Sequence, residues 1–210
     1  MARPDNHAVR LPLFDLASRP VKRYRTLVAD PPWAAVLRAP MRYDGTGNGL
    51  NDYPTMTDAE LMNIPVGLWA EENAHLYLWC LNSNILQAHK VVAAWGFETK
   101  TVITWVKGRL EAGKLVQHIG LGHYFRNSTE HVLFGVRGSL GTLNNDVPTA
   151  LVAPRREHSE KPAAFYDMVL RTSPGPYLDI FARVQRFEFD TFGNESFDFR
   201  EHGIWNGAPR

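Results

Sequence analysis

Short apolar runs alternate with amphipathic segments along this chain, a pattern that is typical of an α/β domain. Thr57 and Glu60 have the spacing of a capping box, Gly96 follows the second amphipathic segment, and Ser159 is the expected N-cap of the third. The amphipathic segments predict helices at residues 57–65, from 83 or 84 to 95, and at 159–171. The apolar runs predict strands at residues 26–29, 75–79, 101–106, 131–136, 151–153, 178–181 and 187–192. This order predicts a three-layer sandwich with a mostly parallel sheet, whose ligands bind beyond the carboxyl ends of the strands.

The length of the chain favours one domain. At 210 residues it is too short for two ordinary domains, so we expect a single domain over residues 1–210, with an N-terminal extension at about 1–23 and a tail at about 197–210. No run approaches the ~20 apolar residues of a membrane span, and residues 1–10 lack the apolar core of a secretory signal. We therefore expect a cytoplasmic protein that does not enter a membrane.

Composition excludes several classes of site. Cys80 is the single cysteine, which excludes an internal disulfide and every multi-cysteine metal pattern. The 8 histidines show no metal-ligand spacing, so no metal is expected, and we interpret His123 and His131 as core or hydrogen-bonding residues. The 23 Lys and Arg against 22 Asp and Glu give a net charge of +1, without the basic excess of a dedicated nucleic-acid binder. Net charge therefore does not identify the partner.

Two intervals without periodicity, residues 34–53 and 107–124, are expected to be long loops. Loops longer than about 12–15 residues in a compact domain are commonly functional lids or disordered segments. The first interval has glycines at positions 45, 47 and 49, but it lacks the strand and helix of a dinucleotide fingerprint, so a lid is favoured. Its candidate nucleic-acid contacts are Arg38, Arg42 and Tyr43.

The tetrapeptide Asp30-Pro31-Pro32-Trp33 follows the first predicted strand. An exocyclic amine such as adenine N6 is a poor nucleophile, because its lone pair is delocalised into the ring. Two acceptors on its hydrogens, the Asp30 carboxylate and the Pro31 carbonyl, would localise that pair, and the prolines leave the turn with acceptors only. Trp33 can stack on a base withdrawn from its neighbours. The structural alternative is a Pro-Pro turn that ends the strand and carries a packed indole.

Further short motifs follow this tetrapeptide in a consistent order that extends to residue 195. They are Tyr53-Pro54-Thr55-Met56-Thr57, Leu76-Tyr77-Leu78-Trp79, Trp95-Gly96-Phe97, Trp105-Val106-Lys107, Gly122-His123-Tyr124, Glu130-His131, Arg155-Arg156-Glu157-His158-Ser159-Glu160-Lys161-Pro162, Leu178-Asp179-Ile180-Phe181-Ala182-Arg183 and Gly193-Asn194-Glu195. The set resembles the MT-A70 family of S-adenosylmethionine-dependent adenine N6-methyltransferases. The resemblance implies a Rossmann-like class I methyltransferase fold with permuted motif order, in which Asp-Pro-Pro-Trp precedes the main cofactor strand.

The resemblance also implies roles for single residues. Lys161 would approach the carboxylate of S-adenosylmethionine. The target amine and base would be held by Asp30, Pro31, Pro32 and Trp33. The cofactor would further contact Asp30, Asp179, Phe181, Arg183, Arg186, Asn194 and Glu195. The basic stretch with Arg155, Arg156 and His158 is either a solvated loop or a mobile gate with arginines on phosphates, and the resemblance favours the gate.

The resulting hypothesis is an adenine N6-methyltransferase that uses S-adenosylmethionine and has nucleic acid as its partner. The run Ala-Pro-Arg-Arg-Glu-His-Ser at residues 153–159 resembles the bacterial and phage branch of the family, for which DNA is favoured over RNA. The competing hypothesis is a catalytically silent nucleic-acid-binding or scaffold subunit of a methyltransferase complex. A homodimer or a partner subunit is compatible with both hypotheses.

Overall fold

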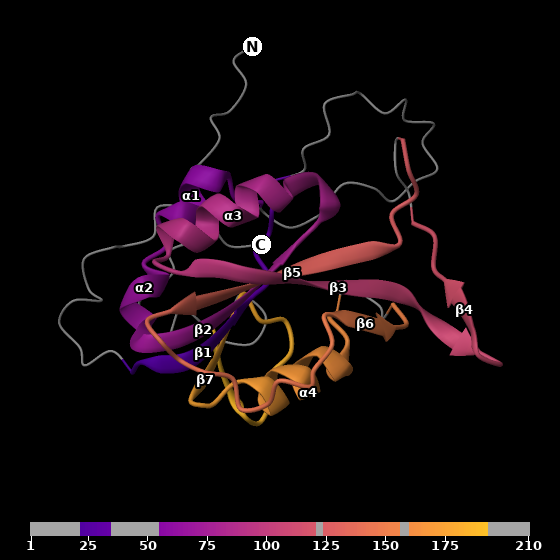
Figure 1. Cartoon of the computed structure of the whole chain (residues 1–210). Helices are drawn as coiled ribbons and strands as arrows, with labels where there is room; N and C mark the ends of the chain where they lie inside the picture. The colour runs from indigo at the N-terminus through magenta and orange to yellow at the C-terminus, as the bar shows by residue number, and fades with distance from the viewer. Residues whose placement is uncertain (1–21, 35–54, 121–123, 156–159, 193–210) are drawn as a thin grey trace, which may run out of the picture.

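The computed structural model describes residues 22–34, 55–120, 124–155 and 160–192. One sheet runs through the middle of this part of the protein, with α1 and α3 on one face and α4 on the other (Figure 1). The strands are β1 (Tyr24–Ala29), β2 (Ala70–Cys80), β3 (Glu98–Glu111), β4 (Lys114–Gln117), β5 (Thr129–Arg137), β6 (Ala150–Ala153), β7 (Tyr177–Ile180) and β8 (Phe189–Phe192). The helices are α1 (Asp58–Met62), α2 (Val66–Trp69), α3 (Ile85–Ala94) and α4 (Ala163–Thr172), with the 3-10 turn η1 (Asn82–Asn84). The expected three-layer α/β sandwich is confirmed.

The strand order across the sheet is β4-β3-β5-β2-β1-β7-β8, and β6 pairs with β3. β1 is parallel to both of its neighbours, β2 and β7, and β7 is parallel to β8. β5 lies antiparallel between β2 and β3, so β3 points in the same direction as β2. The prediction of a mostly parallel sheet is therefore confirmed. The carboxyl ends of β1, β2 and β7 share one edge of the sheet with the beginning of β5.

Side-chain alternation along the strands produces an apolar core on each face of the sheet. In β1, Leu27 belongs to the core under α1 and α3, whereas Val28 belongs to the core under α4. In β2, Leu78 belongs to the first core and Trp79 to the second. β2 is buried continuously over residues 74–80, because both of its faces are covered. The α4 face of these strands also carries the charged residues described below.

Two of the predicted helix ends are confirmed. The capping box has both of its bonds, since Glu60 N donates to Thr57 Oγ1 at 3.3 Å and Thr57 N donates to Glu60 Oε2 at 2.7 Å. Gly96 has a φ of +84° after α3, in the left-handed region that glycine adopts without cost. The expected start at Ser159 is wrong, because α4 begins at Ala163 with Pro162 at its N-cap. A proline disfavours helical backbone at the residue before it, so the helix cannot extend back toward position 159, which lies outside the described residues.

The prediction of a loop at residues 107–124 is wrong for the first half of that interval, which forms strands. β3 continues to Glu111, and β4 returns beside it as a hairpin (Figure 1). Ala112 and Gly113 have φ values of +48° and +76°, the positive pair that a tight hairpin turn requires. The strand expected at residues 178–181 ends one residue early, at Ile180. In the described part of the chain, no helix is long and apolar enough to cross a membrane.

Candidate active site

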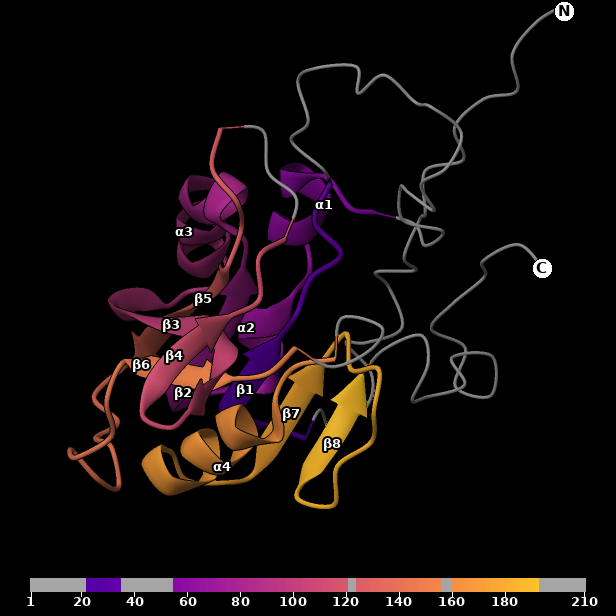
Figure 2. The same ribbon diagram turned by 90° about the vertical axis from the view of Figure 1, so that its right-hand side faces the viewer.

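Two neighbouring strands, β1 and β7, end side by side at the same edge of the sheet (Figure 2). Ala29 lies opposite Ile180, so the next residues, Asp30 and Phe181, leave the sheet together. The Asp30 amide donates to the Ile180 carbonyl oxygen at 3.3 Å. Phe181 has a φ of +66°, a left-handed conformation that is uncommon for a bulky residue and that turns the chain at this point. This edge of the sheet thus brings together a catalytic and a cofactor-binding candidate.

The Pro-Pro-Trp turn after Asp30 is held by main-chain hydrogen bonds. The Trp33 amide donates to the Pro31 carbonyl at 2.9 Å, and the Met56 amide donates to the Pro32 carbonyl at 2.8 Å. The Trp33 side chain is 9% exposed and packs in the core under α1 and α3. In this structure the indole therefore packs against the protein, as in the structural alternative, and its role in base stacking stays a prediction.

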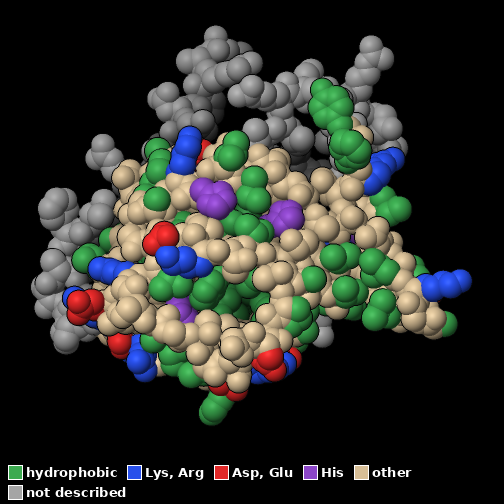
Figure 3. All heavy atoms as spheres, in the orientation of Figure 1, with side chains coloured by type: hydrophobic (Ala, Val, Ile, Leu, Met, Phe, Trp, Pro, Cys, Tyr) green, Lys and Arg blue, Asp and Glu red, His purple; other side chains and the backbone are tan. Residues whose placement is uncertain are grey.

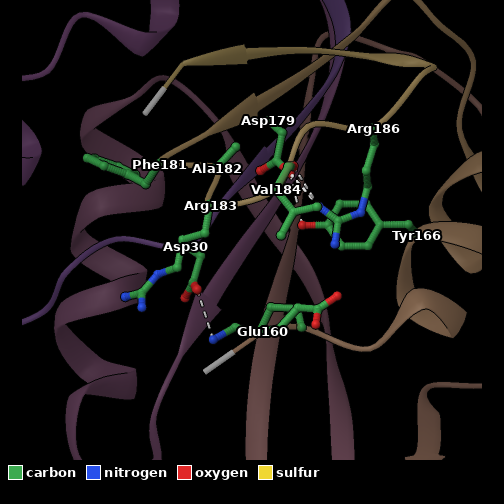
Figure 4. Close-up of a pocket in the computed structure, with 10 residues that line it drawn as sticks. Asp30, Glu160, Tyr166, Asp179, Phe181, Ala182, Arg183, Val184 and Arg186 are labelled. Carbon is green, nitrogen blue, oxygen red and sulfur yellow. Dashed lines mark hydrogen bonds and ion pairs between the residues drawn. The ribbon is translucent and has the colours of Figure 1, made fainter. Parts of the chain in front are cut away.

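Lys161 lies between β6 and α4 and reaches the carboxyl end of β1. Its Nζ is 2.9 Å from Asp30 Oδ2, which is the dashed contact of Asp30 in Figure 4, and 3.2 Å from Glu130 Oε2. The same nitrogen lies 5.0 Å from the centre of the Trp79 ring. Burial alone would lower the pKa of Lys161, but the carboxylates of Asp30 and Glu130 outweigh burial and raise it above its ordinary value. Lys161 is therefore a stable cation at the centre of the site.

A second polar cluster forms around Asp179 in β7. Asp179 is 1% exposed. Tyr166 of α4 donates its hydroxyl to Asp179 Oδ2 at 2.9 Å, and Arg186 Nη1 lies 3.6 Å from the same oxygen. The Arg186 guanidinium stacks on the Tyr166 ring, 3.5 Å from its centre. Burial raises the pKa of Asp179 to about 7, although the Tyr166 hydrogen bond and the Arg186 charge act to lower it. This carboxyl group therefore changes charge near neutral pH.

A pocket opens between these two clusters (Figure 4). Its lining combines carboxylates, cations, a phenol and apolar side chains, namely Asp30, Glu160, Lys161, Tyr166, Asp179, Phe181, Ala182, Arg183, Val184 and Arg186. In the close-up, Asp179 lies beside Tyr166 and Arg186, and Asp30 lies on the opposite side. The structure thus brings together all six of the described cofactor candidates from distant parts of the sequence.

The remaining candidates are not all placed by the structure. Arg155 follows β6 and is exposed. The others lie outside the described residues, namely Arg38, Arg42, Tyr43, Arg156, His158, Asn194 and Glu195. Cys80 is 2% exposed, and burial raises the pKa of its thiol to about 12, as suits an apolar filler rather than a nucleophile. His131 contacts Thr104 and Asn82 by hydrogen bonds, as expected. In the described part of the chain, no group of three His, Cys, Asp or Glu could hold a metal ion.

Sequence reasoning missed three charged or polar residues of the site. Glu130 was recognised as part of a motif but received no role, and neither did Lys107 or Tyr166. Their signal was weak, because a lysine or a glutamate at the end of a predicted strand and a tyrosine in a predicted helix are ordinary surface residues. The pairing of β5 with β3 places Glu130 on the α4 face, and only the tertiary structure brings Lys161 beside it.

The fold and the site together define the class. A mostly parallel sheet between helical layers, with acidic residues and a lysine at the shared strand edge, agrees with the expected Rossmann-like methyltransferase fold. Residues 24–195 match the MT-A70 family, and the chain belongs to that family.

Two kinds of relatives are similar to this chain. The N(6)-adenosine-methyltransferase catalytic subunit METTL3 of Homo sapiens is 28% identical over 179 residues, which cover 82% of this chain and 28% of METTL3. The type II methyltransferase M.MunI of Mycoplasma sp is 29% identical over 195 residues, which cover 84% of this chain and 79% of M.MunI. The chain thus spans less than a third of METTL3 but most of the length of M.MunI.

Proposed function

We propose that this protein transfers a methyl group from S-adenosylmethionine to N6 of adenine in nucleic acid. The observation that carries the proposal is Asp30, whose carboxylate stands at the end of β1 beside the pocket and is paired with Lys161. Family membership and the names of the relatives support the same reaction. The single domain over residues 1–210 and the cytoplasmic location stay predictions.

The chemistry of the pocket lining fits S-adenosylmethionine, which carries a carboxylate, an ammonium, a sulfonium, ribose hydroxyls and an adenine ring. Lys161 offers a cation for the carboxylate. The buried Asp179 offers an acceptor for hydroxyl groups, and Phe181 offers an apolar surface. When bound, this cofactor supplies an electrophilic methyl group. Asn194 and Glu195 stay predicted contacts of its adenosine part.

Asp30 and Pro31 orient the target amine in this proposal. The Asp30 side chain is 23% exposed, so one edge of the carboxylate remains open to the pocket. The Pro31 carbonyl accepts the Trp33 amide and retains a second lone pair for an amine hydrogen. Two acceptors that hold the amine hydrogens direct its lone pair at the methyl group, so orientation and charge stabilisation contribute more than base strength. As the nitrogen–methyl bond forms, the sulfur–methyl bond would break and S-adenosylhomocysteine would leave. The positively charged nitrogen would then lose its proton to the Asp30 carboxylate or to water.

DNA is the proposed form of nucleic acid. The resemblance of residues 153–159 to the bacterial and phage branch supports this choice, and M.MunI, which the chain matches over most of its length, is a bacterial methyltransferase. On the face seen in Figure 3, basic and acidic side chains lie interspersed among apolar ones. The proposed phosphate contacts are therefore the arginines of the lid and of the gate, which are Arg38, Arg42, Arg155 and Arg156. Tyr43 and His158 complete the proposed nucleic-acid contacts.

The test compares Asp30→Ala with the wild type in methyl transfer to adenine-containing DNA and RNA, and in calorimetric titration with S-adenosylhomocysteine. We expect methyl transfer to be lost while cofactor affinity changes much less, because Lys161 retains Glu130 as a partner. Asp167→Ala on the exposed side of α4 is the matched control and should behave as the wild type. Full turnover by a folded Asp30→Ala protein would defeat the mechanism. Absence of cofactor binding by the wild type, with no rescue by a partner, would favour the silent scaffold subunit.

A further inference from the structure

Three charged residues and one tryptophan, from three strands and the turn after β1, form one row on the α4 face of the sheet. The strand order β3-β5-β2-β1 arranges them as Lys107, Glu130, Trp79 and Asp30, with the Trp79 ring in the middle. The four positions share this face because side chains alternate along each strand and β3 pairs with β5 in register. Lys161 reaches the row from the segment before α4 and lies over Trp79.

The contacts along this row are short and partly buried. Lys107 Nζ lies 2.6 Å from Glu130 Oε1, and Lys161 Nζ lies 3.2 Å from Glu130 Oε2. Lys161 Nζ then lies 2.9 Å from Asp30 Oδ2. The side chains of Lys107, Glu130 and Lys161 are between 10% and 15% exposed. Each oxygen of Glu130 therefore has a different lysine as its partner.

The signs of charge alternate along the row, and this alternation determines how each group ionises. Burial would raise the pKa of Glu130, but the ammonium groups of Lys161 and Lys107 outweigh burial and hold it below its ordinary value. Lys161 contacts two carboxylates, those of Asp30 and Glu130. Lys107 contacts the other oxygen of Glu130, and Asp179 interacts with Lys161 electrostatically without contact. Without the carboxylate of Glu130, two ammonium groups would face each other in a partly buried site.

We propose that Glu130 is a positioning residue of the active site, which fixes the Lys161 ammonium beside Asp30 and is itself held in place by Lys107. An ammonium group has three N–H donors. Asp30 and Glu130 accept two of them, so the third remains available to a carboxylate that enters the pocket. Glu130 thus keeps Lys161 between the catalytic carboxylate and the proposed cofactor. The inference rests on the proposed function for what Lys161 binds, but the placement of Lys161 is testable in the free protein.

Competitive labelling with acetic anhydride measures this placement, because only a neutral and accessible amine reacts. The rate for Lys161 is determined by peptide mass spectrometry relative to the exposed Lys90. In Glu130→Gln we expect Lys161 to react at least about tenfold faster, the change that one pKa unit produces in the neutral fraction. Glu98→Gln breaks an exposed Lys-Glu pair by the same substitution and should leave the Lys161 rate unchanged.

The variant Lys107→Met distinguishes a specific effect of Glu130 on Lys161 from a general loosening of the site, because it breaks the same ion-pair row without removing the Glu130 carboxylate. Removal of a nearby cation favours the charged form of Lys161, so its labelling should not become faster in this variant. Equal acceleration in Lys107→Met and Glu130→Gln, or a wild-type rate in Glu130→Gln, would overturn the proposal. If Glu130→Gln does not fold, Glu130→Asp retains the charge on a shorter side chain that cannot span both lysines, and an intermediate rate is expected. A wild-type rate in that variant also contradicts the proposal.

Kinetics provide the second readout. We expect Glu130→Gln to lower kcat at least about tenfold while the KM for S-adenosylmethionine changes less than about threefold, because the lysine cation remains but is less well placed. The double variant Glu130→Gln with Lys161→Met should be no slower than Lys161→Met alone, since both act through one group. If the decreases in kcat caused by Glu130→Gln and by Lys161→Met multiply in the double variant, the two residues act independently and the proposal is contradicted. If the wild type transfers no methyl group, the proposed function fails, and the labelling rates still decide the role of Glu130.

Discussion

The indole Nε1 of Trp33 donates a hydrogen bond to the main-chain oxygen of Trp79 at 2.9 Å. This bond joins the turn after β1 to the carboxyl end of β2, while the Met56 amide holds the same turn at the Pro32 carbonyl. Asp30 therefore lies between a strand and a turn that are both fixed, so its carboxylate is oriented before any ligand enters. The burial of Trp33 in the core is what makes this anchoring effective.

Trp33→Phe should lower both stability and turnover. The variant loses a buried hydrogen bond and part of a buried ring, so we expect the free energy of unfolding in urea to fall by about 1–3 kcal/mol. Trp95→Phe is the matched control, since Trp95 Nε1 donates to the Leu61 main-chain oxygen at 2.9 Å and Trp95 is 2% exposed. We expect a similar loss of stability in the control but a lower kcat only in Trp33→Phe. An unchanged kcat in Trp33→Phe would show that the anchor does not orient Asp30.

A buried polar network around His75 determines the tautomer of its ring. His75 Nε2 lies 2.9 Å from the Leu140 carbonyl oxygen and must donate to it, so Nδ1 is an acceptor. Ser173 therefore donates its hydroxyl to Nδ1 at 2.8 Å, and Tyr77 donates to Ser173 Oγ at 2.7 Å. Burial lowers the pKa of His75 below its ordinary value, with the Leu140 carbonyl acting in the opposite direction. His75 is thus neutral in the fold.

Stability should decrease as the pH falls below about 6.5. In the unfolded chain His75 binds a proton near its ordinary pKa of 6.5, whereas in the fold it does so only at a lower pH. Between these values the unfolded state binds more protons, so stability rises with pH, by at most about 1.4 kcal/mol per pH unit for one proton. Urea unfolding at pH 5.5 and 7.5 should show a smaller difference in His75→Gln than in the wild type. His89→Gln, at an exposed position on α3, should retain the wild-type difference.

Cofactor affinity should depend on the ionisation of Asp179. Because burial raises the pKa of this carboxyl to about 7, it is mostly protonated at pH 6 and mostly ionised at pH 8. An ionised carboxylate is the better acceptor for a hydroxyl group, so S-adenosylhomocysteine should bind up to about tenfold more tightly at pH 8. Asp179→Asn should bind more weakly and without this dependence. The same ratio of affinities in both proteins, measured by calorimetry, would assign the dependence to another group.

The lid arginines should affect nucleic acid but not the cofactor. Arg38 and Arg42 lie outside the described residues, so this prediction depends on the sequence alone. In Arg38→Ala with Arg42→Ala we expect a higher KM for nucleic acid and a weaker dependence of binding on salt, because two phosphate contacts are lost. S-adenosylmethionine affinity should remain nearly unchanged. Equal KM values for the double variant and the wild type at two salt concentrations would remove the lid from the mechanism.

The sequence by itself determined the features that depend on near neighbours in the chain. The strand that ends at Asp30, the capping box at Thr57 and the helix end at Gly96 follow from local backbone preferences and short-range hydrogen bonds. The family motifs also pointed to Lys161 and Asp179, and both residues line the pocket. The start of α4 at Ala163 could also have been predicted from the sequence, because Pro162 disfavours helical backbone at the residue before it.

Only the tertiary structure decided which charged residues meet. Lys107, Glu130 and Lys161 come from separate segments, and their contacts depend on β5 lying between β2 and β3 and on the register of these pairs. A shift of one residue in either pairing would move Glu130 to the opposite face of the sheet, away from Lys161. Local sequence carries no signal of that register, because it is determined by the packing of both apolar cores over the whole sheet. The same long-range packing buries Asp179 and so determines its charge.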